Sequence, residues 1–282
     1  MPTSRPIPIS DASDPRLTLY RHVANPSALT GAGLFVAEGR IVVERLIEDG
    51  RFAVESVVAT PAAAAALGVL LERRSNVTLH VCDPAVLEAV TGYDFHRGCL
   101  ALARRPAATP GLAQFASASR LLALEGVANP DNVGGLFRVA LAFDAGGLLL
   151  DPSTADPLYR KAIRTSMAAT LRVPFARVDP WPAALDDLKN AGCTFVALTP
   201  DPSAMPIDDY AAKPGERIVF MLGSEGAGLR PATLRYADAM LRVVVNQRAD
   251  SLNVVVAAGI ALNAVRERKP PARVERERVN SA

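Results

Sequence analysis

The chain has 282 residues, of which half are hydrophobic and only three are cysteine, and its 31 basic against 29 acidic residues give a formal charge of +2. This composition excludes a disordered chain, because ample apolar surface can be buried, and it excludes a disulfide scaffold. The near-neutral charge neither requires nor forbids a nucleic-acid partner. The length favours two domains over one.

The N-terminal sequence and the cysteines bear on the cellular compartment. Residues 1–14 are polar and contain three prolines, so they lack the apolar core of a signal peptide. No apolar run reaches the roughly 18–20 residues that a membrane span needs. Cys82, Cys99 and Cys193 are far apart, and we expect buried, reduced thiols rather than metal ligands. We therefore expect a cytoplasmic protein with no metal and no membrane association.

The segment 104–119, RRPAATPGLAQFASAS, has the composition of a linker, with prolines, a glycine and small residues. We predict a first domain over residues 1–105, a linker over 106–119 and a second domain over 120–282. In the first domain, hydrophobic spacing predicts a small α/β unit of about four strands. The strands are expected at 35–37, 54–59, 77–81 and 99–103, and the helices at 39–49, 61–73 and 84–90.

The second domain alternates strand and helix patterns more strongly. Such alternation predicts an α/β fold with a mostly parallel sheet and helices on both faces. The strands are expected at 121–126, 147–150, 173–178, 194–198, 218–222 and 240–245, and the helices at 132–145, 158–171, 183–191, 231–236 and 251–268. Ligands of such sheets bind beyond the carboxyl ends of the strands. The loops to search are therefore 127–132, 199–205, 223–229 and 246–251.

The first of these loops leads into a helix with two adjacent glycines, Gly134 and Gly135. Each glycine costs the helix roughly 1 kcal/mol relative to alanine, which indicates close approach by a backbone or a ligand. Arg138 is the only charge on the apolar stretch that follows. It is either a surface arginine or, as we predict from its apolar neighbours, a directed and partly buried guanidinium.

The loop 223–229, GSEGAGL, lets backbone groups approach a ligand through its three glycines. It matches neither a Walker A loop nor the dinucleotide fingerprint, and by itself a tight turn explains it equally well. The third segment places Ser251 as a helix cap before a helix that is apolar nearly all round through Val265. We expect that helix to pack against its own domain and a second subunit.

Together, these three segments resemble the signature motifs of the SpoU/TrmH family of RNA 2′-O-ribose methyltransferases, within the SPOUT superfamily. The first motif of that family is similar to Asn132, Gly134 and Arg138, and the second is similar to residues 223–229. The third is similar to Ser251-Leu252-Asn253-Val254. The first domain, at residues 35–40, resembles the substrate-binding domain of the family, a fold akin to RNA-binding ribosomal proteins.

The resemblance implies a trefoil knot over roughly residues 217–268, an exception to the rule that chains are unknotted. It also implies S-adenosylmethionine (AdoMet) bound in the knot, and a homodimer. The cofactor contacts implied are Thr199, Leu222, Gly223, Gly228, Val243, Val245 and Leu252, and the catalytic group implied is Arg138, Asn132, Glu225, Ser251 and Asn253. The sequence departs from the family at 243–245, where Val-Val-Val replaces Ile-Pro-Met, and at 166–169, where Ser-Met-Ala-Ala replaces Ser-x-Gly-Ala.

An RNA substrate requires basic surface, and residues 158–178 hold five basic residues and no acid. We predict that Arg160, Lys161 and Arg164 contact RNA phosphates, the alternative being a solvated helix face. The resemblance favours ribosomal RNA, and leaves open transfer RNA or a non-catalytic RNA-binding member of the fold. A dinucleotide-dependent oxidoreductase is disfavoured because Gly31-Ala32-Gly33 lacks the third glycine, and a serine hydrolase because no G-x-S-x-G segment exists.

Overall fold

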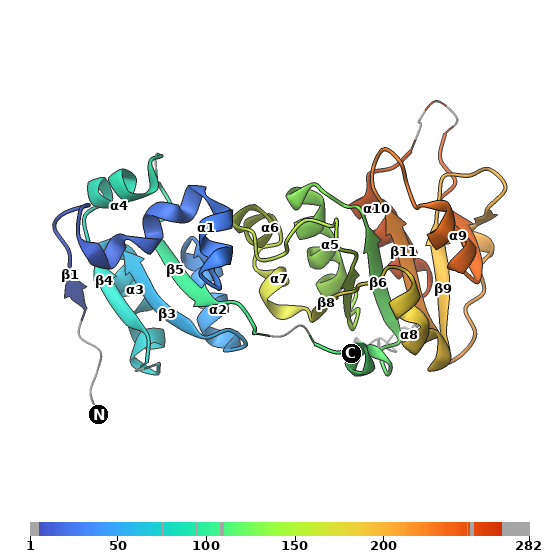
Figure 1. Ribbon diagram of the computed structural model, residues 1–282, viewed down its shortest axis with the longest axis horizontal. Coiled ribbons are helices and arrows are strands. Elements are labelled where there is room, and N and C mark those ends of the chain that lie inside the picture. The colour runs from blue at the N-terminus through green and yellow to red at the C-terminus, as the bar shows by residue number, and fades with distance from the viewer. Residues whose placement is uncertain are drawn as a thin grey trace, which may run out of the picture.

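The computed structural model describes residues 6–266 except 75, 94, 108, 109, 247, 249 and 250. Two separate β-sheets follow each other along the long axis of the molecule (Figure 1). The first sheet has five strands in the order β1-β4-β3-β5-β2. Its strands are β1 Ile7–Pro8, β2 Leu34–Glu38, β3 Val54–Ala59, β4 Thr78–Val81 and β5 Cys99–Arg104. The four strands predicted here are confirmed, and β1 was missed because two residues form no pattern.

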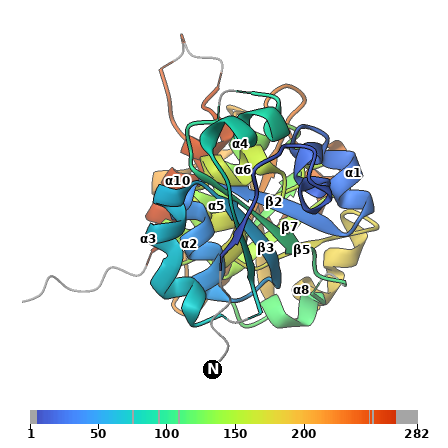
Figure 2. The ribbon, with the colours of Figure 1, turned by 90° about the vertical axis from the view of Figure 1, so that its left-hand side faces the viewer.

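The first sheet is mixed, because β5 runs antiparallel to β2 and β3 while β4 runs parallel to β1 and β3. Helices α2 and α3 cover one face, and η1, η2, α1 and α4 cover the other, as the end view shows (Figure 2). The helices of this part are η1 Pro15–Leu17, η2 Leu19–Ala24, α1 Pro26–Gly31, α2 Arg40–Asp49, α3 Pro61–Glu72 and α4 Pro84–Thr91. The sequence missed η1, η2 and α1.

The second sheet has seven parallel strands in the order β10-β12-β9-β11-β6-β7-β8. These strands are β6 Arg120–Glu125, β7 Gly147–Leu150, β8 Phe175–Arg177, β9 Cys193–Leu198, β10 Met205–Pro206, β11 Arg217–Gly223 and β12 Ala239–Arg242. The predicted parallel sheet is therefore confirmed. Strand β11 lies between β6 and β9, although both precede it in the chain. The strand order reverses at this point, which is where such sheets bind ligands.

Helices cover both faces of the second sheet. Apolar side chains of α5, α6, α7 and α10 pack on one face, and those of η3, α8 and α9 pack on the other. The helices are η3 Leu112–Phe115, α5 Pro130–Ala142, α6 Arg160–Thr165, α7 Ala169–Arg172, η4 Ala183–Leu185, α8 Asp186–Asn190, η5 Ile207–Asp209, α9 Pro231–Tyr236 and α10 Val254–Ala264. Within the ranges described, no helix is long and apolar enough to cross a membrane.

One predicted helix, over 158–171, is wrong as a single element. It is broken between α6 and α7, where Met167 and Ala168 have φ angles of 52° and 69°. Ser166 stabilises the break, since its hydroxyl donates to the Ile163 carbonyl oxygen at 2.9 Å and accepts from the Thr170 N–H at 3.3 Å. Other elements are also shorter than predicted: β8 covers only Phe175–Arg177, β12 ends at Arg242, and α10 begins only at Val254. Residues 267 and 268 of the predicted last helix lie outside the described part.

The two sheets are joined through the helices that lie between them in Figure 1, α2 on one side and α6 and α7 on the other. Arg160 of α6 pairs with Glu38 at the end of β2, at 3.0 Å. Arg172 of α7 pairs with Asp49 at the end of α2, at 3.2 Å. These contacts, together with the apolar cluster shared by both parts, hold the two sheets in contact.

Candidate active site

A cavity of about 810 Å³ opens beyond the carboxyl ends of β9, β11 and β12. All seven residues predicted to contact a cofactor line it, and so do Glu225 and Ser251 of the predicted catalytic group. The lining residues are Leu198, Thr199, Pro200, Pro202, Leu222, Gly223, Ser224, Glu225, Gly226, Gly228, Leu241, Arg242, Val243, Val245, Asn246, Ser251, Leu252, Val254 and Ala257. Most of the wall is apolar, and a few polar groups converge on it, as in ordinary small-molecule sites.

The glycine loop, residues 223–229, forms one wall of the cavity by folding back on itself. The Gly228 N–H donates to the Ser224 carbonyl oxygen at 3.0 Å. A β-carbon added at Gly223 would lie 2.1 Å from the backbone carbonyl carbon of Gly228, a distance that no side chain can occupy. The loop is thus a tight turn that Gly223 allows to close on itself, and three of its glycines, Gly223, Gly226 and Gly228, line the cavity.

Beside the cavity, three predicted catalytic side chains form a chain of hydrogen bonds. The Asn253 side-chain amide donates to the Asn132 side-chain oxygen at 3.1 Å, and the Asn132 amide donates to Glu225 Oε1. Asn253 is also the cap of α10, since its side-chain oxygen accepts from the Val255 N–H at 2.9 Å. The cap predicted at Ser251 is therefore wrong by two residues. Asn132 lies in the first turn of α5, Asn253 caps α10 and Glu225 belongs to the glycine loop, and together they fix the orientation of the Glu225 carboxylate.

The adjacent glycines of α5 explain how Asn132 reaches this cluster. A β-carbon at Gly135 would lie 2.7 Å from the Val255 side chain of α10, and one at Gly134 would lie 2.6 Å from the Ala162 carbonyl oxygen of α6. The close approach predicted from these glycines is confirmed, and the neighbours are two helices. Packed this closely, α5 holds its first turn against the start of α10.

Arg138 does not join the cluster. It is exposed, and among the described residues it has no hydrogen bond or ion pair, so the predicted partial burial of its guanidinium is wrong. The physical reason is helix geometry: six residues beyond Asn132, α5 has turned by about 240° and risen by about 9 Å. Arg138 therefore faces solvent on the same exposed side as Leu141, which is 40% exposed.

The three arginine and lysine residues predicted to contact RNA lie at the start of α6 and in its last turn. Arg160 is engaged inside the chain, because it pairs with buried Glu38 and lies 4.9 Å from the centre of the Tyr93 ring. Lys161 pairs with Asp131 at 2.8 Å. Arg164 is half-exposed, and no carboxylate in the described ranges forms an ion pair with it. Residues 158–178 contain no acid, but the fold brings Glu38 and Asp131 from other parts of the chain to Arg160 and Lys161.

Two features of the site were missed by sequence reasoning. Arg242 is the one cation among the described residues that line the cavity, and its Nε donates to the Ala204 carbonyl oxygen at 3.0 Å. It sits inside a predicted strand, where no periodicity distinguishes it. Glu125 and Asp151 are almost fully buried carboxylates at the ends of β6 and β7. The sequence pattern that could have revealed them is an acidic residue that ends, or directly follows, an apolar strand. In the part of the chain described, no three His, Cys, Asp or Glu side chains gather to hold a metal ion.

The fold and the cavity together define a class, an α/β protein with a parallel sheet whose small-molecule site is built from the loops around its last strands. A profile described as the SpoU rRNA Methylase family matches residues 119–263. An uncharacterized tRNA/rRNA methyltransferase of Mycobacterium tuberculosis is 36% identical over 90% of this chain and 89% of its own length. The chain therefore belongs to the SpoU rRNA methylase family.

Further relatives have more specific descriptions. A 23S rRNA (guanosine-2′-O-)-methyltransferase RlmB from Burkholderia is 30% identical over 70% of this chain and 81% of its own length. The crystal structure of an AdoMet-bound rRNA methyltransferase from Sinorhizobium meliloti superposes with a TM-score of 0.77 at 22% identity, and covers 91% of this chain and 96% of that one. At that level of identity the superposition shows the shared fold.

Proposed function

We propose that the chain is an AdoMet-dependent RNA methyltransferase that methylates a ribose 2′-hydroxyl, in ribosomal RNA. The observation that carries this proposal is the convergence on one cavity of the glycine loop, Thr199, residues 243–245 and Leu252 beside the Asn253–Asn132–Glu225 chain. The relatives named above support RNA as the substrate, and the RlmB relative supports the ribose hydroxyl and ribosomal RNA. Because the proposed substrate is ribosomal RNA, we continue to expect a cytoplasmic protein.

The cavity fits AdoMet in size and in chemistry. Its volume of about 810 Å³ lies within the range of small-molecule sites. Gly223, Gly226 and Gly228 line the cavity without side chains, so a ligand can approach the backbone there. Leu222, Val243 and Leu252 supply apolar wall for an adenine ring. AdoMet would supply an electrophilic methyl group on a sulfonium.

The protein has to hold the ribose hydroxyl in line with that methyl group and assist removal of its proton. The Glu225 carboxylate is fixed through Oε1 by Asn132, so its second oxygen is free to bind the hydroxyl. Asn253 fixes Asn132 in turn, and Ser251 lines the cavity beside them. Arg138 is a poor base because a guanidinium keeps its proton far above neutral pH. We assign Arg138 the role of orienting the 2′-oxygen or its neighbouring phosphate through charge-assisted hydrogen bonds.

Arg138 reaches such a position if the enzyme works as a homodimer. Its exposed face of α5 carries apolar Leu141, and α10 beside it exposes Val256, 49% accessible. We propose that these faces of α5 and α10 meet their copies in a second chain, and that Arg138 of one chain completes the site of the other. The exposed position of Arg138 in the single chain supports this arrangement.

Three further expectations belong to the proposal. The first sheet and its helices serve as an RNA-recruiting domain, joined by the segment 106–119 to the catalytic domain. Arg164 contacts RNA phosphates with Lys161 beside it, while Arg160 joins the two parts of the chain. The segment from 217 to 268 forms the trefoil knot of the SPOUT fold, part of it outside the described residues. Transfer RNA remains the second candidate, because the Mycobacterium relative is described as a tRNA/rRNA methyltransferase.

The test combines a map and a complementation experiment. Deleting the gene should remove one 2′-O-methyl site from ribosomal RNA, and loss of a transfer RNA site instead would favour the second candidate. Arg138→Ala and Asn132→Ala should each abolish methylation. Mixing the two variants should restore about a quarter of the wild-type activity if each site uses residues of both chains. No recovery on mixing would place Arg138 in the site of its own chain.

A further inference from the structure

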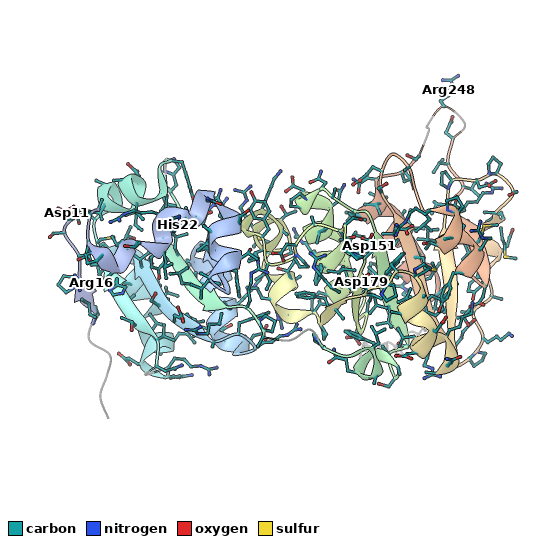
Figure 3. The ribbon with its side chains drawn as sticks, viewed as in Figure 1. Asp11, Arg16, His22, Asp151, Asp179 and Arg248 are labelled. Atoms are coloured by element: carbon teal, nitrogen blue, oxygen red, sulfur yellow. The ribbon has the colours of Figure 1, made fainter. Side chains whose placement is uncertain are left out.

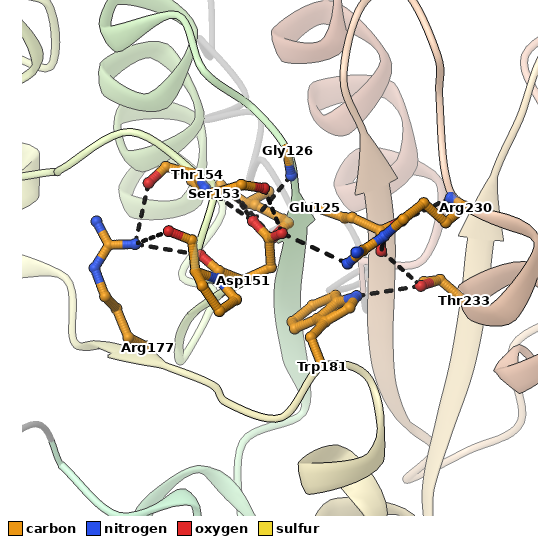
Figure 4. Close-up of polar contacts among 11 residues, drawn as sticks. Glu125, Gly126, Asp151, Ser153, Thr154, Arg177, Trp181, Arg230 and Thr233 are labelled. Carbon is orange, nitrogen blue, oxygen red and sulfur yellow. Dashed lines mark hydrogen bonds and ion pairs between the residues drawn. The ribbon is translucent and has the colours of Figure 1, made fainter.

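Two buried carboxylates lie at the ends of neighbouring strands, Glu125 on β6 and Asp151 after β7, and neither lines the cavity (Figure 4). Glu125 is 3% exposed and Asp151 is 1% exposed. Carboxylates this deeply buried persist only when they are paired or well hydrogen-bonded. The groups bound to them therefore indicate what the carboxylates do.

The Glu125 carboxylate binds the chain at the point where the glycine loop ends. It accepts the Arg230 backbone N–H at 2.7 Å, the Arg230 Nε–H at 2.6 Å and the Thr233 hydroxyl at 2.7 Å. Arg230 directly follows the loop and is the N-cap residue of α9, whose own side chain caps nothing. The Glu125 side chain therefore takes the place of a helix cap, with charge-assisted hydrogen bonds.

The same residue also holds the beginning of the loop. In the parallel ladder between β11 and β6, Gly223 is the register partner of Glu125. Backbone pairing thus fixes the first residue of the loop, and the Glu125 side chain fixes the residue after its last. Both ends of the loop that forms a wall of the cavity are attached to one residue.

Asp151 supports this arrangement from the next strand. Its carboxylate accepts from the Gly126 N–H at 2.9 Å, and Arg230 Nη2 lies 3.7 Å from it. Burial raises the pKa of Asp151, but hydrogen bonds from Gly126, Ser153 and Thr154 outweigh that effect and keep its pKa below the ordinary value. A β-carbon added at Gly126 would lie 3.7 Å from the Cβ of Ser224, so Gly126 faces the second residue of the loop. Figure 3 labels Asp151, which directly follows β7 of the second sheet, and Figure 4 shows Arg230 between the two acids.

We propose that Glu125 and Arg230 are positioning residues that clamp the glycine loop in its binding conformation and thereby set the affinity for AdoMet, without touching the cofactor. The effect on the affinity for AdoMet rests on the proposed function. The clamp itself concerns only the loop and can be measured in the protein alone.

The test compares two arginines of the same helix region. Arg230→Met removes the guanidinium between the two acids, whereas Arg235→Met changes an exposed arginine of α9 that forms no hydrogen bond or ion pair in the described ranges. In the free protein, Arg230→Met should speed amide hydrogen exchange across residues 223–229. Binding of S-adenosylhomocysteine, measured by calorimetry, should weaken about ten-fold. Arg235→Met should match the wild type in both measurements.

Steady-state kinetics separate a positioning role from a general loss of stability. Arg230→Met should raise KM for AdoMet more than it lowers kcat, and Arg230→Lys should recover part of the affinity because it keeps a cation beside both acids. Unchanged loop exchange in Arg230→Met would overturn the clamp. Faster exchange with unchanged ligand affinity would overturn its link to the cofactor. If the wild-type protein binds no S-adenosylhomocysteine, the proposed function fails, and the exchange measurement alone decides the clamp.

Discussion

Arg160 donates a hydrogen bond to the Glu38 carboxylate at 3.0 Å, although 122 residues separate the two in sequence. Glu38 is 4% exposed and also accepts from the Tyr93 hydroxyl at 3.2 Å. Arg97 pairs with its other oxygen at 3.3 Å. A buried carboxylate at the end of the first sheet thus depends on a guanidinium from the second part of the chain. Substituting either residue of this pair therefore measures how much the contact between the two parts of the chain contributes to stability.

Removing Arg160 should destabilise the fold. We expect Arg160→Met to lower the free energy of unfolding by about 2 kcal/mol, less than for an isolated buried pair because Arg97 remains. Urea denaturation measures the change, and Arg164→Met on the same helix, with no carboxylate partner in the described part, should cost below about 0.5 kcal/mol. The double variant with Glu38→Gln should recover part of the loss. Equal effects of Arg160→Met and Arg164→Met would refute this account.

The end of α5 offers a stabilising substitution. Asp144 directly follows Phe143, the C-cap residue of α5, and its side chain is exposed. Its φ of 54° is a left-handed conformation that favours glycine. Asp144→Gly should raise the free energy of unfolding by about 1 kcal/mol. Asp144→Asn is the matched control, because it removes only the charge at the negative end of the helix dipole and should gain less. A lower melting temperature in Asp144→Gly would contradict the prediction.

Stability should fall with mild acid because of His80 in β4. Its buried Nδ1 atom has no hydrogen-bond partner among the residues that the structure describes. Burial and nearby Arg16 lower the pKa of His80 from 6.5, and Asp14 partly opposes that shift. A histidine whose pKa is lowered by folding stabilises the protein above its unfolded pKa, and that contribution is lost as the pH falls below about 6.5. His80→Gln should therefore flatten the loss of stability between pH 7 and pH 5. An unchanged slope in thermal unfolding would exclude His80 as the cause.

Two glycines of the same loop should respond differently to alanine. At Gly223 a β-carbon would meet the Gly228 backbone, whereas at Gly226 no atom of the described residues would lie within 4 Å of it. Gly223→Ala should displace the loop and weaken binding of S-adenosylhomocysteine more than about 100-fold, while Gly226→Ala leaves the loop backbone in place and should weaken binding far less. Calorimetry measures both. Equal binding by the two variants would mean that the loop does not form the ligand wall.

Hydrophobic spacing was sufficient to locate most strands and helices, because each element buries one side against a sheet. It failed over 158–171, where the break depends on left-handed Met167 and Ala168 rather than on glycine or proline. The cavity residues were found through resemblance, since no periodicity singles out Thr199 or Val243. Contacts between residues far apart in the sequence could not be predicted from spacing. Arg160 stood in an acid-free stretch, and its acid comes from the first sheet.

The place of β11 in the second sheet has a consequence for how the protein is made. Until residues 217–223 leave the ribosome, β6 and β9 have no strand between them, and each presents an open edge. The first sheet, complete by residue 104, can fold during synthesis, while the second must wait for a strand made late and inserted centrally. A nascent chain halted before residue 217 would therefore expose one unpaired edge of β6 and leave β9 without either of its neighbours, β11 and β12, and would depend on a chaperone to escape aggregation.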